Sequence, residues 1–187
     1  MYSNSNFLID TPYDKRIFII NGVGGVGKDT FVEMVNGYVP CSNYSSVHQI
    51  KYVAGLLGWN GEKDDKSRKF LSDLKILASN YNDSPYLDVI DRLHHFIFSM
   101  YETDEILFIH IREPEEICRV VDFCESNNIK VNTVLITNHN TFQSYFGNEA
   151  DDNVFKFNYD YVVNNNGSLS DLCEEAKKFL NFFKFDF

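Results

Sequence analysis

Residues 22–30 have the types and the spacing of a loop that binds phosphate groups. Four of the chain's ten glycines fall within six residues, and a lysine follows directly: Gly22-Val23-Gly24-Gly25-Val26-Gly27-Lys28-Asp29-Thr30. Glycines let successive backbone N–H groups point at one phosphate, and the N-terminus of a following helix adds its partial positive charge. Lys28 then supplies a mobile full charge. Chance produces Gly-x4-Gly-Lys roughly 0.03 times in a chain of this composition, which disfavours the alternative of a glycine-rich turn without a ligand.

Asp29 departs from the usual form of such a loop. The residue after the lysine is normally Ser or Thr, whose hydroxyl helps to hold Mg²⁺. Here it is Asp29, and Thr30 comes one residue later. A carboxylate beside a triphosphate is repelled unless a cation lies between them, so we expect Asp29 to face Mg²⁺ or a water bound to it. Thr30 would reach the α-phosphate. The alternative is that Asp29 is only a first-turn acid, which the helix dipole favours.

The elements around this loop alternate between strands and helices. An apolar run at 16–21 predicts a strand buried on both faces, and a helix is expected over 30–37. Asn43 to Ser46 offer caps for a helix that follows. The further expectations are helices over 47–58, 65–81 and 85–101, strands over 105–111, 130–136 and 159–164, and helices that begin at 114 and 168. Leu77 and Phe98 are expected on the buried faces of their helices. This order predicts an α/β fold with a mostly parallel sheet of about five strands, covered on both sides.

The 187 residues are expected to form one domain, residues 1–187. Residues 1–14 are a polar lead-in. The helical segment 45–101 is where a substrate-binding insertion would lie, and the polar stretch 137–158 is interpreted as a lid or a surface loop.

Composition excludes several function classes. The formal net charge of −10 argues against a nucleic-acid polymer as partner. No stretch approaches the ~18 apolar residues of a membrane span, and the first fifteen residues lack the features of a signal peptide, so a cytoplasmic location and no membrane partner are expected. The four cysteines lack metal-type spacing and are expected to be free thiols. They are Cys41, Cys118, Cys124 and Cys173.

At Gly27-Lys28-Asp29-Thr30 the sequence resembles the nucleoside monophosphate kinase branch of the P-loop kinases, especially the phage-type deoxynucleoside monophosphate kinases. Those kinases, like the related phosphomevalonate kinases, have Asp after the lysine. The segment 48–75 is similar to their acceptor-binding region, HIREPEEI (110–117) is similar to their Asp-x-Arg-x-Pro segment at a strand end, and 159–172 is similar to the last strand and helix of many small-molecule kinases.

This resemblance implies a three-layer P-loop NTPase fold with a helical acceptor-binding insertion. It also implies transfer of the γ-phosphoryl group of ATP, with Mg²⁺, to a small phosphorylated metabolite, foremost a (deoxy)nucleoside monophosphate. Residues 22–30 would bind the triphosphate, with Lys28, Asp29 and Arg112 in catalytic roles and Asp29 at the metal. The acceptor phosphate would be held by Lys51, Arg68 and Arg112.

Two departures from the family keep other functions open. His110 stands where the family has an aspartate, and the stretch 137–158 contains no arginine and only Lys156. Lid arginines contribute roughly 10³-fold or more to the rate of phosphoryl transfer. The alternatives are a non-catalytic or regulatory nucleotide-binding protein, or a kinase of another phosphorylated metabolite. The sequence predicts neither the acceptor nor the oligomeric state.

Several candidate side chains also have purely structural interpretations. Arg68 would lie on a solvated helix face. His110 would be a hydrogen-bonded core histidine. Trp59 and Tyr81 would pack between helices rather than stack on a base. His94 and His95 cannot both face inward and have no third ligand nearby, so no zinc site is expected.

Overall fold

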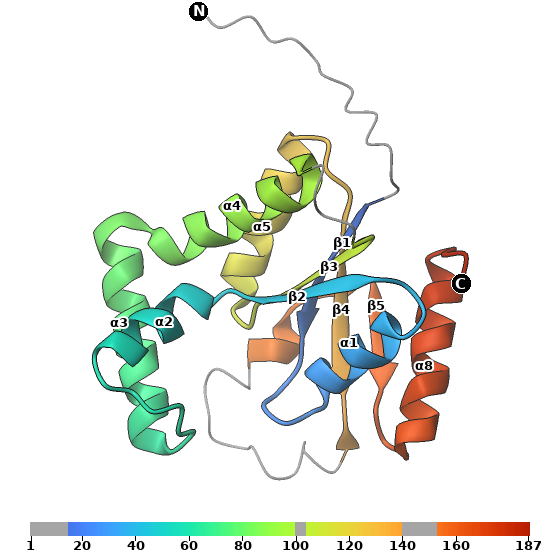
Figure 1. Cartoon of the computed structure of the whole chain (residues 1–187), viewed down its shortest axis with the longest axis horizontal. Helices are drawn as coiled ribbons and strands as arrows, with labels where there is room; N and C mark the ends of the chain where they lie inside the picture. The colour runs from blue at the N-terminus through green and yellow to red at the C-terminus, as the bar shows by residue number, and fades with distance from the viewer. Residues whose placement is uncertain (1–14, 100–103, 140–152) are drawn as a thin grey trace, which may run out of the picture.

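The computed structural model describes residues 15–99, 104–139 and 153–187. In these ranges five strands form one sheet in the order β2-β3-β1-β4-β5, and every pairing is parallel. The strands are β1 (Arg16–Asn21), β2 (Cys41–Ser45), β3 (Ile106–His110), β4 (Val131–Thr137) and β5 (Tyr161–Asn164) (Figure 1). The predicted α/β class with a parallel five-stranded sheet is confirmed.

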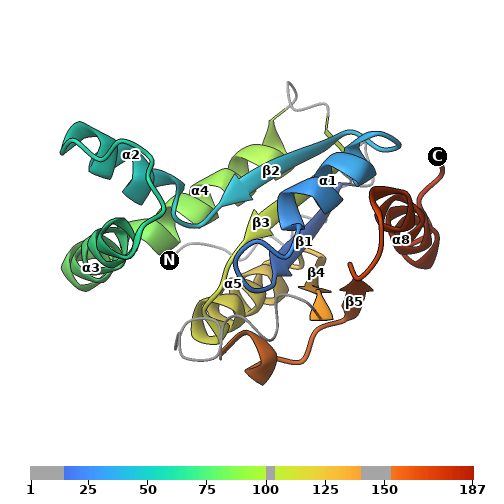
Figure 2. The same ribbon diagram turned by 90° about the horizontal axis from the view of Figure 1, so that it is seen from below.

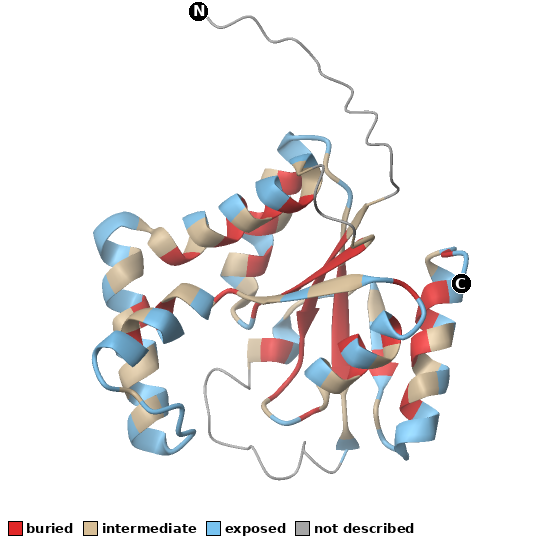
Figure 3. Ribbon diagram, in the orientation of Figure 1, coloured by how far each residue is buried: buried red, intermediate tan, exposed pale blue. Residues whose placement is uncertain are grey.

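Helices cover both faces of this sheet, as the alternation of β1 residues requires. Phe18 and Ile20 join one buried cluster with α1 (Lys28–Asn36) and α8 (Leu169–Phe182). Ile17 and Ile19 join the other, with α4 (Ser84–Phe98) and α5 (Pro114–Ser126). Figure 3 shows the buried residues concentrated in the strands and in the helix faces turned toward them. Because β1 is apolar at every position from 17 to 20, it is buried on both sides, as expected.

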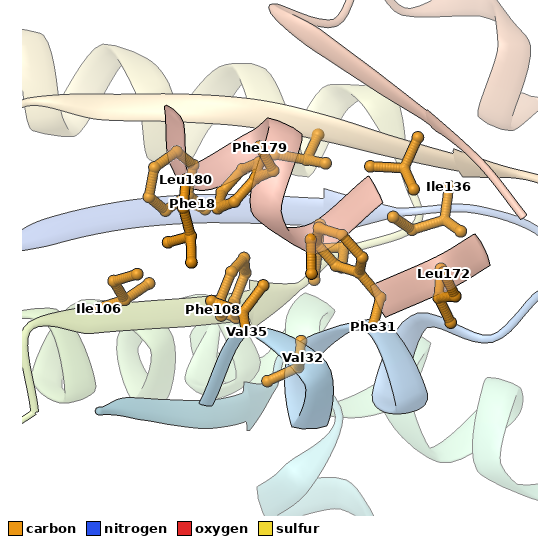
Figure 4. Packing of buried hydrophobic residues seen from close by; sticks show 14 of the residues in the cluster. Phe18, Phe31, Val32, Val35, Ile106, Phe108, Ile136, Leu172, Phe179 and Leu180 are labelled. Carbon is orange, nitrogen blue, oxygen red and sulfur yellow. The ribbon is translucent and has the colours of Figure 1, made fainter. Parts of the chain in front are cut away.

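Aromatic side chains fill the α1–α8 side of the core. The ring of Phe18 on β1 packs edge-on against that of Phe179 on α8, with 4.8 Å between centroids, and Phe31 of α1 contacts both Phe108 and Phe179 (Figure 4). Ser168 and Asp171 form the predicted capping box at the start of α8. This packing fixes the start of α1, and therefore the glycine loop that precedes it.

The strand β2 was not predicted. Asn43 to Ser46 were interpreted as helix caps, but Asn43 and Ser45 lie within β2, which pairs with β3. This strand is at the edge of the sheet and is only half-buried, so its sequence CSNYS lacks the apolar run by which β1 was found.

Between β2 and β3 the described residues form the helices α2 (His48–Leu56), α3 (Asp65–Asn82) and α4. In both views α2 and α3 lie on the opposite side of the molecule from α8 (Figures 1 and 2). The expected burial of Leu77 and Phe98 is wrong: their side chains are 66% and 55% exposed. The helical pattern predicted α3 correctly, but the face that α3 buries carries Lys75 rather than Leu77.

The expected lid falls mostly outside the described residues. Of the stretch 137–158, residues 140–152 are not described, and the short helix η1 (Asn153–Lys156) follows them. All four cysteine thiols are free, as expected. None of the described helices has the length and hydropathy needed to cross a membrane.

Candidate functional site

The glycine loop joins β1 to α1 at the carboxyl edge of the sheet, where β1 lies between β3 and β4. Two glycines in it have no substitute. Gly22 has φ +147°, and a Cβ there would lie 2.5 Å from the Ile136 carbonyl oxygen. Gly27 has φ +93°, and a Cβ there would collide with the amide of Asn165. Both positions therefore need glycine, because of their positive φ and because the loop packs closely against the end of β4 and the turn after β5.

Lys28 begins α1 and folds back over the loop. Its ammonium donates hydrogen bonds to the carbonyl oxygens of Gly22, at 2.6 Å, and Val23, at 2.9 Å. Gly27 at the N-cap has no side chain to cap the helix, so the first N–H groups of α1 stay available to an anion. Loop, ammonium and helix N-terminus together have the chemistry of a phosphate site.

Asn21 anchors the loop, and the sequence reasoning missed it. This fully buried residue accepts a hydrogen bond at Oδ1 from the N–H of Gly22 (2.8 Å). Its Nδ2 donates to the Arg112 carbonyl (3.0 Å) and to the Tyr159 hydroxyl (2.7 Å). A polar residue that ends an apolar strand immediately before a glycine loop was the signal available.

Asn165, which follows β5, is a second contact that was not predicted. Its side-chain amide donates to the Val26 carbonyl at 2.9 Å, and its backbone N–H donates to the Thr137 carbonyl at 2.8 Å. The turn after β5 is thereby held beside the glycine loop, at the same edge of the sheet.

His110 lies at the end of β3, next to this loop, as its strand position predicts when β3 neighbours β1. Burial lowers the pKa of His110 to about 4; Asp29 opposes that shift, whereas Lys28, Lys51 and Arg112 add to it. The charges of these four residues, from α1, α2 and the end of β3, therefore all influence one neutral imidazole. The interpretation of His110 as a hydrogen-bonded core histidine is wrong for Nε2, which is buried without a hydrogen-bond partner in the described structure.

Asp29 reaches toward that imidazole. One carboxylate oxygen lies 3.7 Å from His110 Nε2, and the same oxygen accepts a hydrogen bond from Asn43 Nδ2 at 3.2 Å. The Asp29 side chain is 81% exposed. Asn43 was missed because β2 was missed. A carboxylate beside an unpartnered imidazole nitrogen is a donor set that fits a divalent cation.

The insertion is tied to the strand-end residue Arg112 through Lys75. The Lys75 ammonium lies 2.9 Å from carboxylate oxygens of both Glu113 and Glu116, and Lys75 is only 9% exposed. For Glu113, burial acts to raise the pKa, but the Lys75 ammonium outweighs it and the pKa is lowered. For Glu116, burial is the larger effect and the pKa is raised. Glu113 directly follows Arg112, so this contact holds one face of α3 toward the end of β3.

Arg68 shares that face of α3. Seven residues separate Arg68 from Lys75, which places them within about 20° of each other around the helix and roughly 10 Å apart along it. Arg68 is exposed. Lys28, Asp29, Lys51 and Arg112 thus all act electrostatically on His110, and Asp29 also lies 3.7 Å from it. Arg68 lies on the face of α3 that carries Lys75, and among the described residues it is not one of the main charges that act on His110.

The other aromatic and histidine candidates stay apart from the glycine loop. The Trp59 indole N–H donates to the Glu62 carbonyl at 3.1 Å. Tyr81 is 86% exposed, so its expected packing role is wrong. The His94 ring packs on Phe98 and Phe123. No group of three or more His, Cys, Asp or Glu side chains that could hold a metal ion occurs in the described parts of the chain.

Comparisons with known proteins show where this fold occurs. No protein-family model and no curated protein sequence matches the chain. A tunicamycin resistance protein from Deinococcus radiodurans matches with TM-score 0.58 and 9% identity over 92% of this chain and 98% of that one. Thymidylate kinase from Candida albicans matches with TM-score 0.53 and 9% identity, over 91% and 92%. A Thermus thermophilus protein matches with TM-score 0.51 and 13% identity, over 92% and 99%. At such identities the likeness shows the fold alone: the chain has the α/β fold of the P-loop NTPases, found in P-loop kinases.

Proposed function

We propose that this protein is an ATP-dependent phosphotransferase that moves the γ-phosphoryl group to a small phosphorylated acceptor, with a (deoxy)nucleoside monophosphate as the first candidate. One observation carries the proposal. The glycine loop leads into α1, whose N-terminus has no side-chain cap, and the Lys28 ammonium is hydrogen-bonded across the loop at 2.6 Å and 2.9 Å. The similarity of the fold to that of a thymidylate kinase is consistent with this proposal.

The nucleotide would bind to residues 22–30. Lys28 now donates to two loop carbonyls, and phosphate oxygens would replace these acceptors and gain a stronger, charge-assisted bond. Thr30 in the first turn of α1 would reach the α-phosphate. Asp29 would hold Mg²⁺, whose charge offsets that of the phosphates when it is bound.

The acceptor phosphate would be held by Lys51, Arg68 and Arg112. Arg112 follows the end of β3 and Lys51 lies on α2. The positive charges of both lower the pKa of His110, which lies next to the glycine loop. Arg68 approaches from α3. Guanidinium forks match phosphate geometry, and a phosphate acceptor is already ionised, so placement and charge suffice without a general base.

The test is ADP release from ATP, measured with a panel of nucleoside monophosphates and other small phosphates. We expect one acceptor class to raise the rate, and Lys28→Ala to abolish the transfer because the mobile charge on the transferring group is lost. Lys178→Ala is the control, since its ammonium only pairs with Glu175 on the surface of α8. Unchanged transfer by Lys28→Ala would refute the assignment.

A regulatory nucleotide-binding protein is the second candidate, and His110 in place of the family's strand-end aspartate is the observation in its favour. Tight binding of Mg·ATP without any acceptor-dependent ADP release would establish it over the kinase.

A further inference from the structure

His110 is a buried polar side chain that the proposed reaction leaves without a role. Its Nε2 is buried and has no hydrogen-bond partner in the part of the chain that the structure describes. A buried nitrogen without a partner costs free energy, so it calls for an explanation such as a catalytic role, a bound water or an ion. The Asp29 carboxylate, 3.7 Å away, is the nearest acidic group that the structure shows for it.

The separation of the two groups suits a shared cation. Two ligand atoms each ~2.1 Å from one ion lie ~3.0 Å apart in an octahedral site and ~3.4 Å apart in a tetrahedral one. The observed 3.7 Å closes to these values with a small rotation of Asp29, whose side chain is 81% exposed. Asn43 restrains the same carboxylate through its 3.2 Å hydrogen bond.

The chemistry of the pair separates it from an all-oxygen magnesium site. Mg²⁺ binds oxygen ligands, whereas imidazole nitrogen suits transition metals. We propose that Asp29 and His110 form a mixed oxygen–nitrogen site for the divalent cation of the bound nucleotide, and that this site favours a transition-metal ion such as Mn²⁺ over Mg²⁺. The inference rests on the proposed function, because phosphate oxygens and water must complete the coordination.

The surrounding charges make the site depend on the nucleotide. The pKa of His110 is lowered in part by the positive charges of Lys28, Lys51 and Arg112. The same charges would repel a bare cation at this site. No third His, Cys, Asp or Glu joins the pair within residues 15–99, 104–139 and 153–187. A polyphosphate cancels the repulsion and supplies ligands, so Mn²⁺ should bind tightly only together with ADP or ATP.

The experiment uses the full chain with ADP and Mn²⁺, and it reads the metal directly. Electron spin echo modulation of bound Mn²⁺ should show nitrogen coupling, and this coupling should change when histidine is labelled with ¹⁵N. His110→Asp should remove it and lower the Mn²⁺-to-Mg²⁺ affinity ratio about tenfold, as loss of a ligand nitrogen implies. His94→Gln is the control, because His94 is an exposed histidine on α4; it should leave both readouts unchanged.

The outcomes separate this inference from the proposed function. Nucleotide binding with no nitrogen coupling in the wild type, and an equal affinity ratio in His110→Asp, overturns the mixed site and leaves the kinase proposal standing. Failure of the nucleotide to bind with either metal overturns both. The wild-type spectrum decides the question alone if His110→Asp does not fold, which circular dichroism would reveal.

Discussion

Asn21 connects three parts of the candidate site through one side chain. It receives the N–H of Gly22, and it donates to the backbone just after β3 and to Tyr159 ahead of β5. Burial raises the pKa of Tyr159 to about 12, against the hydrogen bond from Asn21, so the hydroxyl stays neutral and relays a bond to the Val154 carbonyl. The glycine loop is therefore placed by an amide rather than by its glycines alone.

Asn21→Leu should destabilise the protein and weaken nucleotide binding. The side chains have similar sizes, but leucine leaves the buried Gly22 N–H and the part-buried Arg112 carbonyl without these partners, at a cost of about 2 kcal/mol. Urea unfolding measures the free energy of unfolding. The control is Asn127→Ala: that exposed amide bonds only within its own helix end, so the change should stay within about 0.5 kcal/mol. Equal effects of the two substitutions would remove the anchoring role.

At the scale of single residues, spacing along the chain found part of the site. Lys28 and the glycines are consecutive, so their chemistry could be predicted from a few positions. Asn21, Asn43 and Asn165 could not be singled out, because each has a hydrogen-bond partner in the site that is 14 to 139 residues away in the sequence. His110 was placed near the loop, but its unpartnered nitrogen follows from packing, which spacing does not describe.

The tie between α3 and α5 depends on one buried lysine. Lys75→Met removes the cation from between Glu113 and Glu116 and leaves their two carboxylates facing each other. Both acids are partly exposed, so the expected loss is about 1–3 kcal/mol in the free energy of unfolding rather than the larger cost of a fully buried pair. The measurement is again urea unfolding.

Lys69→Met on the same helix is the matched control for this change. The pair of Lys69 and Asp73 is exposed on both sides, at 76% and 58%, so its loss should change stability by less than about 0.5 kcal/mol. Equal losses in the two variants would show that α3 is not held to α5 through Lys75.

Arg68 tests whether the insertion receives the acceptor. Because Arg68 lies on the face of α3 that Lys75 holds toward Arg112, Arg68→Ala should raise the KM for the acceptor far more than the KM for ATP. Removal of a charged phosphate contact implies about a tenfold rise or more. Lys69→Ala, one residue further around the helix, should leave both KM values near wild type. An equal rise in the two KM values would exclude Arg68 from the acceptor site.

Elements were predictable where periodicity is strong and hidden where it is weak. The strand at 16–21 and the helix that begins at 114 emerged as expected, because one is apolar throughout and the other has a proline in its first turn and a regular buried face. The edge strand β2 could not be found by the same means, since among the described strands it pairs on one side alone and its side chains are mostly half-buried. Leu77 satisfied the helical period but is 66% exposed, because α3 packs on α2 and α4 and its one buried residue is Lys75.

At the scale of the whole molecule, the order of the strands brings segments that are distant in the sequence to the same edge of the sheet. Sequence reasoning predicted parallel strands but not the order β2-β3-β1-β4-β5, which depends on pairings between distant segments. This order puts β1 at the centre, so the loop after it has the end of β3 on one side and that of β4 on the other. The chain carries a net charge of −10, yet the charges of Lys28, Lys51 and Arg112 all act on His110 at this edge, so an anion there finds local positive charge.

That concentration of charge predicts how nucleotide affects the stability of the whole chain. A ligand that binds only the folded state stabilises it by about 2.7 kcal/mol at a concentration of 100 times its Kd, which corresponds to a rise in Tm of about 5–10 °C for a protein of this size. We expect Mg·ATP to give such a rise in a thermal melt, because the proposed site would bind phosphate through backbone N–H groups and cations. Adenosine, which lacks phosphates, should give almost none. Lys28→Ala should remove most of the rise while melting near the wild-type temperature without ligand, because its ammonium bonds loop carbonyls and belongs to neither buried cluster. A wild-type chain whose Tm responds equally to adenosine and to Mg·ATP would mean that the loop after β1 does not bind phosphate.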